Sequence, residues 1–220
     1  MKFSAKLILA ILVLCVAACT GSLFKSKAAP PTIYVLSTKP SSGVDATAGA
    51  APGAARVAMP VDLAVLKPRV RTGLETDRIA VLYPDRRLDY FADARWSGSL
   101  GEVLQDLAVQ EFHSHARLRT VSGDASVFAS AYWLEIEVSD FQAEYGSAAA
   151  APTVRVHFLA RIGSSGDRRI LGQFAASAQQ PATENRLTAI VDAYAHAADA
   201  AMSDIVAQAA AVLAQSSEAR

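Results

Sequence analysis

The sequence predicts an α+β fold: a single domain with a mainly antiparallel sheet and two helices packed on one face of it. Two runs predict the sheet, because apolar and polar side chains alternate with a period of two over residues 132–141 and 153–162. Two others predict the helices, because apolar residues recur with a period of 3.6 over residues 100–112 and 187–213. The 220 residues suffice for one ordinary domain with appendages.

The first residues predict a bacterial lipoprotein signal peptide, residues 1–18. Lys2 and Lys6 precede a short apolar run that ends by Val16, well below the roughly 20 apolar residues that a membrane-spanning helix needs. Small residues then stand directly before Cys19, as in the lipoprotein cleavage box. We expect diacylglycerol on the Cys19 sulfur and a further acyl chain, such as palmitate, on its freed amine, because two or three chains anchor a protein stably. The alternative is an ordinary secreted protein with a chance cysteine.

Cleavage fixes the cysteine chemistry and charge of the mature chain. Cys15 leaves with the leader, so Cys19 stays alone and no disulfide forms. Loss of Lys2 and Lys6 from 21 basic residues leaves 19 against 21 acidic ones, a net charge near −2. Nucleic acid is not an expected partner, since it would need a clustered basic surface.

Residues 19–31 are small, polar and Pro-containing, and we interpret them as a tether between the lipid and a domain over residues 32–215. Residues 39–55 are a Pro/Ser/Gly/Ala segment that cannot bury enough apolar surface, which predicts a flexible loop. Pro60 predicts an edge position or a bulge. Strands are predicted where short apolar runs lie between turn residues: 32–38, 56–62, 78–83, 88–91, 117–121, 132–141, 153–162 and 169–177.

The first predicted helix begins at a capping box, Ser99 with Glu102 three residues later. The second carries an unbroken apolar stripe over residues 187–213 and would reach roughly 45 Å at 1.5 Å per residue. That length exceeds the width of a small sheet, so we expect its C-terminal half to protrude or to pack on a neighbour. Residues 216–220 should fray.

The residues predict no catalytic, metal or cofactor site, and therefore a protein that is not an enzyme. His113 and His115 fall where they can cap the end of the first helix, and His157 and His196 fall on polar faces. The serines of residues 97–101 do not match the Gly-x-Ser-x-Gly nucleophile elbow.

The segment over residues 69–95 holds six arginines interleaved with five acidic residues. A mixed-charge surface is the preferred interpretation, with a patch for a partner or lipid headgroups as the alternative. Trp96 follows Arg95 just before the capped helix. Two roles are open for this pair: Trp96 as a plug in the core between sheet and helix, or an exposed anchor for a docking partner.

Several segments resemble the ABC-type transport auxiliary lipoprotein family. They are Tyr34-Val35-Leu36, Leu74-Glu75-Thr76-Asp77-Arg78-Ile79-Ala80-Val81, Asp89-Tyr90-Phe91, Ala92-Asp93-Ala94-Arg95-Trp96 and Leu134-Glu135-Ile136-Glu137-Val138-Ser139-Asp140-Phe141, the last similar to the family's central strand. The resemblance covers roughly residues 32–213. Family members often follow Arg-Trp with an acidic residue and a proline. This chain has Ser97-Gly98-Ser99 instead, so no contact made there is transferred to it.

The resemblance implies a non-enzymatic auxiliary component of an ABC transporter with a mammalian-cell-entry (MCE) type subunit, which moves phospholipid or another hydrophobic substrate across the cell envelope. The implied partners are an MCE-domain protein and the ABC permease and ATPase, with the membrane contacted through the lipid anchor. Thr20 replaces the Asp that often retains such lipoproteins in the inner membrane, which favours the outer membrane, facing the periplasm. The alternative is a structural or assembly lipoprotein of the outer membrane that forms a homo-oligomer through its long C-terminal helix.

Overall fold

The computed structural model describes residues 30–36, 59–116, 118–123, 129–146 and 150–218. The chain divides into two compact units, Met1–Pro31 and Thr32–Arg220, and the description that follows concerns the second. The predicted signal peptide, Cys19 and the loop predicted over residues 39–55 lie outside the described residues.

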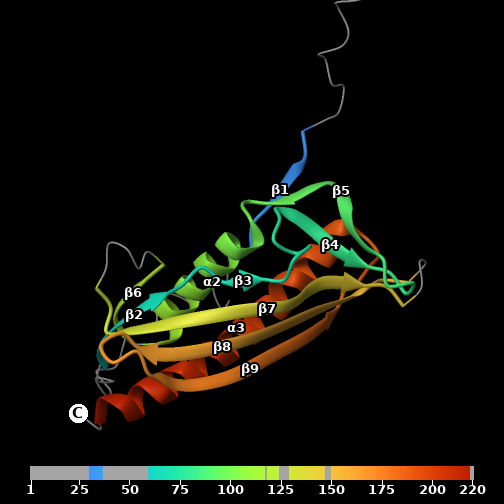
Figure 1. The fold of residues 1–220 in the computed structure, drawn as a ribbon. Helices are drawn as coiled ribbons and strands as arrows, with labels where there is room; N and C mark the ends of the chain where they lie inside the picture. The colour runs from blue at the N-terminus through green and yellow to red at the C-terminus, as the bar shows by residue number, and fades with distance from the viewer. Residues whose placement is uncertain (1–29, 37–58, 117, 124–128, 147–149, 219–220) are drawn as a thin grey trace, which may run out of the picture. The chain divides into compact units, whose positions relative to one another are not determined.

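The described elements are nine strands and two helices, and the three longest strands follow one another before the last helix (Figure 1). They are β1 (Thr32–Tyr34), β2 (Met59–Val65), β3 (Arg69–Val70), β4 (Arg78–Leu82), β5 (Leu88–Trp96), α2 (Leu100–His115), β6 (Leu118–Ser122), β7 (Tyr132–Glu144), β8 (Thr153–Ser164), β9 (Ile170–Pro181) and α3 (Leu187–Glu218).

Strand β7 is the centre of the sheet. Along one edge it pairs in succession with β2, β3 and β4, all parallel to it, and along the other it pairs antiparallel with β8, which in turn pairs antiparallel with β9. The 13 residues of β7 extend over about 44 Å, long enough to hold three short strands end to end. The α+β prediction is therefore confirmed, and the sheet is a mixed one whose longest ladders are antiparallel.

Both helices lie on one face of the sheet (Figure 1). The predicted stripe of α2 is buried throughout, including Leu104, Leu107 and Phe112, and it belongs to the same hydrophobic core as Leu134 and Ile136 of β7. The capping box is present, with the Ser99 N–H donating to Glu102 Oε2 at 3.1 Å. Periodicity thus placed the helices and the inner face of the sheet correctly, because burial of apolar side chains dictates both.

Helix α3 lies along the sheet for nearly its whole length. The expectation that its C-terminal half protrudes is therefore wrong. Burial continues to Ala209 and Leu213, each 0% exposed. The reason is that β7, β8 and β9 have 12 to 13 residues, longer than predicted, so their roughly 41–44 Å nearly match the ~48 Å of the 32-residue helix. The described part of the expected tail, residues 216–218, is helical.

Among the described helices, α3 alone is long and apolar enough to cross a membrane by length and composition. Its buried stripe packs on β8 and β9, as in the core helix of a globular domain.

Candidate interaction surface

The face of the sheet opposite the helices carries the half-exposed and exposed side chains of the three long strands. On β7 and β8 these alternate with the core residues, and β9 continues the pattern: Trp133, Glu135, Glu137, Thr153, Arg155, His157, Leu159, Arg161, Gln173, Ala175, Ser177 and Gln179. We call these residues the open face. No described helix covers it (Figure 1).

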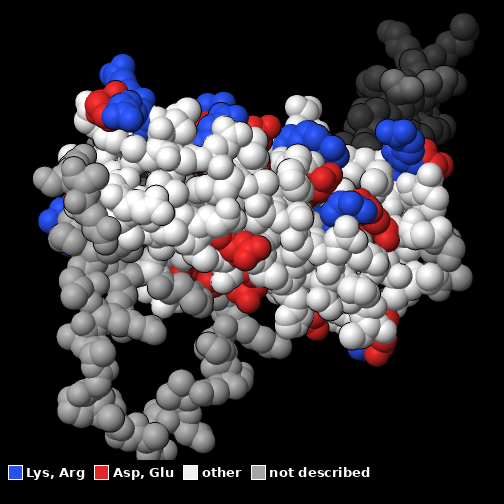
Figure 2. Space-filling model, turned by 90° about the horizontal axis from the view of Figure 1, so that it is seen from below, with Lys and Arg blue, Asp and Glu red and all other residues white. Residues whose placement is uncertain are grey.

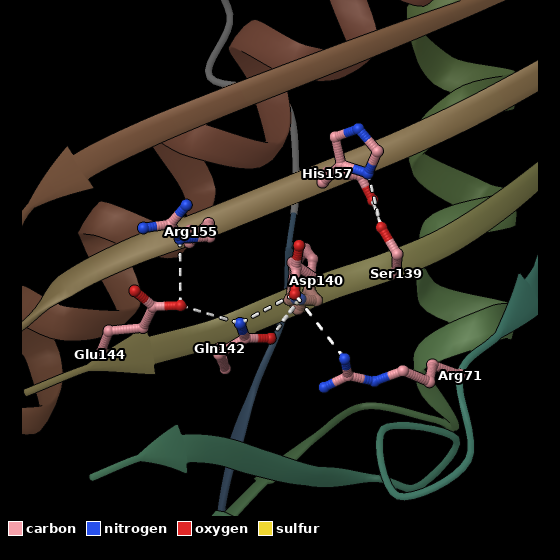
Figure 3. Close-up of polar contacts among 8 residues, drawn as sticks. Arg71, Ser139, Asp140, Gln142, Glu144, Arg155 and His157 are labelled. Atoms are coloured by element: carbon pink, nitrogen blue, oxygen red, sulfur yellow. Dashed lines mark hydrogen bonds and ion pairs between the residues drawn. The ribbon is translucent and has the colours of Figure 1, made fainter. Parts of the chain in front are cut away.

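A β-bulge interrupts β7 in the middle of the open face. The register with β8 passes from Val138↔Phe158 to Asp140↔His157, so Ser139 is an extra residue on β7. The bulge reverses the alternation: Val138 and, beyond it, Phe141 are both buried in the core. Two polar side chains, Ser139 and Asp140, therefore lie side by side on the open face (Figure 3).

A connected set of polar contacts starts at Asp140 and runs toward the end of β7 (Figure 3). The Gln142 amide nitrogen donates to Asp140 Oδ1 and to Glu144 Oε1, each at 3.1 Å, and its oxygen accepts from the Phe141 N–H at 2.9 Å. Arg155 Nε lies 3.0 Å from Glu144 Oε1, an ion pair. Gln142 is 1% exposed, and these contacts satisfy a polar group that would otherwise be costly to bury.

Arginines from β3 and the segment after it neutralise the same face. Arg69 Nη2 lies 2.6 Å from Glu135 Oε1, and Arg71 Nη1 lies 3.9 Å from Asp140 Oδ1. Arg161 contributes a second contact to Glu135, at 3.3 Å. Acidic residues on β7 thus pair across the strands with Arg161 of β8, while Arg155 of β8 pairs with Glu144 at the far end of β7.

Ser139 and His157 form a close pair, with 2.5 Å between Ser139 Oγ and His157 Nδ1. A serine nucleophile also needs a third group that orients the histidine and donors for an oxyanion. No carboxylate hydrogen bond or ion pair to His157 is found among the described residues. The described residues also hold no cluster of three or more His, Cys, Asp or Glu able to bind a metal. The pair is best explained as a hydrogen bond that satisfies the polar side chains of Ser139 and His157 at the bulge.

Two hollows flank the open face. One, of about 600 Å³, is lined mainly by apolar groups and has Trp133 and Leu66 in its wall. Trp133 lies flat against Gly163, where an added Cβ would stand 2.3 Å from the indole. The other, of about 440 Å³, is polar and is bounded by Arg71, Arg86, Glu144 and the stacked rings of Tyr83 and Tyr145, whose centroids are 5.7 Å apart.

The structure places Trp96, a predicted site residue, in the core. It is 2% exposed and packs edge-to-face on Phe141 and Tyr194, with centroid distances of 6.2 and 5.3 Å. Of the two roles left open, the structure therefore gives Trp96 the core one. Tyr194 completes the cluster, and its hydroxyl donates to the Ala80 carbonyl at 2.5 Å. Burial raises the pKa of Tyr194.

Arg95 points away from that cluster and is tied to Asp77, with 2.6 Å between Nη1 and Oδ2. This hydrogen bond lowers the pKa of the Asp77 carboxyl. The neighbouring charges are largely paired too, as between Arg87 and Asp89 at 3.0 Å. The mixed-charge interpretation of this segment agrees with these contacts, and Arg95 is engaged within the chain.

The remaining candidates take no part in the open face. His113 and His196 are exposed, and the side chain of His115 lies outside the described residues. Sequence reasoning missed the bulge and the contacts of Gln142. The signal was present in Val138-Ser139-Asp140-Phe141, where two polar residues between two apolar ones break the period of two.

Comparison with known proteins gives a family and a fold. The sequence matches the family model described as ABC-type transport auxiliary lipoprotein component over residues 36–206. No curated protein matches the sequence. The fold is similar to the crystal structure of protein XCC0632 from Xanthomonas campestris, assigned to DUF330, with a TM-score of 0.66, 21% identity and coverage of 86% of this chain and 98% of that one. It is also similar to hypothetical protein CT253 from Chlamydia trachomatis, with a TM-score of 0.50, 10% identity and coverage of 71% and 99%.

Proposed function

Because the chain belongs to the family of ABC-type transport auxiliary lipoprotein components, we propose that it is a non-enzymatic, membrane-anchored accessory of an ABC transporter of the MCE type. The system moves phospholipid or another hydrophobic substrate across the cell envelope. The observation that carries the proposal is the family match, which spans residues 36–206 and therefore most of the domain.

Acyl chains on Cys19 anchor the protein to the membrane. The small residues before it support cleavage and lipidation at this position, and the acyl chains hold the domain at the membrane surface. Thr20 supports the outer membrane rather than the inner, with the domain facing the periplasm. The tether between Cys19 and the first strand gives the domain reach toward its partners.

The contacts on the open face support a binding role over a chemical one. Glu135, Asp140 and Glu144 each lie beside an arginine, so none is an isolated acid or base. Ser139 and His157 satisfy each other at the bulge. ATP hydrolysis is the work of the partner subunits, and this chain supplies a docking surface to the permease, the ATPase and an MCE-domain protein.

Transfer of labelled phospholipid between inner and outer membranes, followed in both directions in cells lacking the chain, tests the proposal. The wild-type chain and Cys15→Ser restore transfer, because Cys15 leaves with the leader. Cys19→Ser does not restore it, because the domain loses its anchor. Normal transfer without the chain overturns the phospholipid assignment, and full rescue by Cys19→Ser overturns the role of the anchor.

A further inference from the structure

Strand β9 is a long edge of the sheet. Within the described residues it pairs with β8 alone, over a ladder from Thr153↔Pro181 to Gly163↔Ile170. Its 12 residues extend over about 41 Å. The N–H and C=O groups on the side away from β8 therefore form a row that no other described strand satisfies.

Between the register shift at its start and Pro181 at its end, the edge lacks the features by which proteins normally protect such strands. Edge strands are usually short, charged, bulged or covered, because an open edge pairs with other chains. Strand β9, from Ile170 to Pro181, contains no charged residue, and its register with β8 shifts only at its first residues. By contrast, β1 has three residues, and the five-residue β6 carries Arg119, which is paired with Asp62.

Side-chain exposure agrees with an uncovered edge. Along β9, Gln173, Ala175, Ser177 and Gln179 are exposed on the open face. On the helix face Phe174 is only half-buried, although it packs against the core. Helix α3 covers one face of β9 and leaves this edge as the boundary of the sheet (Figure 1).

The helix that covers the other face of β9 is acidic. Helix α3 carries Asp192, Asp199 and Asp204 and, over residues 187–217, no Lys or Arg. Figure 2, which views the side where β9 and α3 lie lowest in Figure 1, shows a largely uncharged surface with acidic side chains alone at its centre. A second copy would bring another acidic α3 toward this one, whereas a basic partner would be attracted to it.

We propose that β9 is a docking edge, to which an extended segment of a partner protein adds as a further strand, with Lys or Arg residues of that segment beside the acidic surface of α3. Main-chain hydrogen bonds supply the affinity in this mode of recognition, and the flanking charges supply the selectivity. The inference deepens the proposed function, on which it rests, by assigning the contact with a transporter subunit to β9.

Photocrosslinking in membranes tests this placement with the full-length, lipidated chain. A benzoylphenylalanine replaces Ser177, exposed on β9, or Ala92, exposed on β5, as the matched control. After illumination, mass spectrometry maps the adducts. The expected result is an adduct from position 177, and none from position 92, to a Lys- or Arg-bearing extended segment of a transporter subunit. An adduct to a second copy of this chain overturns the proposal.

A pair of charge variants then tests the electrostatic part. Asp204→Lys, on the exposed side of α3, places a like charge beside the basic segment and should lower recovery of the partner roughly two- to fivefold, whereas Asp204→Glu should retain it. Equal loss in both variants contradicts the proposed charge of the partner. If the partner is recovered undiminished in both variants and no adduct forms at position 177, the docking edge is wrong while the proposed function stands. If the subunits are not recovered with the wild-type chain, the proposed function itself fails.

Discussion

Trp96 shows how one residue joins the parts of this domain. It ends β5, just before α2 begins, and its ring contacts Phe141 of β7 and Tyr194 of α3. Sequence reasoning found this residue and left its role open, because an Arg-Trp pair before a capped helix is compatible with either core or surface. Only the pairing of β5 with β4, and the crossing of α3 behind it, decides that the indole is enclosed.

We predict that Trp96→Ala lowers the free energy of unfolding by about 3–5 kcal/mol, because it leaves a cavity beside the rings of Phe141 and Tyr194. Urea denaturation followed by circular dichroism measures this. Trp133→Ala is the matched control, since Trp133 lies half-exposed on the open face and should cost clearly less. Equal losses in the two variants would mean that the aromatic cluster does not hold the domain together.

We predict that the domain loses stability at high pH because the hydroxyl of Tyr194 is buried. Burial raises the pKa of its hydroxyl, so the folded state keeps the phenol neutral while the unfolded chain ionises above about pH 10. The contribution is therefore fully present below about pH 10 and is lost as pH rises further.

Tyr194→Phe should be about 1 kcal/mol less stable at neutral pH, having lost the hydrogen bond to the Ala80 carbonyl, but should lose less stability on going to about pH 11. Urea titrations of both proteins between about pH 8 and 11 give the comparison. Parallel pH curves would exclude Tyr194 as the source.

At the scale of elements, the sequence predicted which helices and strands form, and which of their faces is buried, better than it predicted where they end. The inner face of β7 and the stripes of α2 and α3 were predicted because burial imposes a period on them. The last residues of β9, Ala178-Gln179-Gln180-Pro181, have no such period, and their strand conformation comes from pairing with β8. The bulge at Ser139 likewise follows from the register of two strands.

We predict that substitutions of Gly163 and Trp133 have coupled effects on the stability of the domain. They are cross-strand neighbours, and a methyl group at position 163 would meet both the indole and the Arg169 carbonyl, the latter at 2.8 Å. Gly163→Ala should therefore destabilise the domain by about 1–3 kcal/mol.

Adding Trp133→Ala should relieve only part of that loss, because the contact with the carbonyl persists. A double-mutant cycle by urea denaturation isolates the coupling. Gly166→Ala, with open space around it, is the control and should be near neutral. Additive effects of the two substitutions at positions 133 and 163 would show that the indole does not lie against Gly163 in solution.

For the whole molecule, the arrangement separates a packed face from a face available for binding. Both helices occupy one side of the sheet, while the open face and the β9 edge remain accessible in the described domain (Figure 1). The fold class and the family could be predicted from the sequence. The parallel pairing of β2, β3 and β4 with β7 could not, because nothing in the sequence of a short strand specifies which distant strand it pairs with. The surface that we propose for a partner also depends on strand order, because this order leaves β9 at the edge of the sheet.

Co-purification from native membranes tests the central claim most directly. The full-length chain, tagged at its C-terminus and extracted in mild detergent, is compared with Cys19→Ser as the unanchored control, and the recovered proteins are quantified by mass spectrometry. The account predicts that the wild-type chain recovers an ABC permease, its ATPase and an MCE-domain protein together, and that Cys19→Ser loses most of this recovery. Recovery of unrelated envelope proteins alone by the wild-type chain would contradict it.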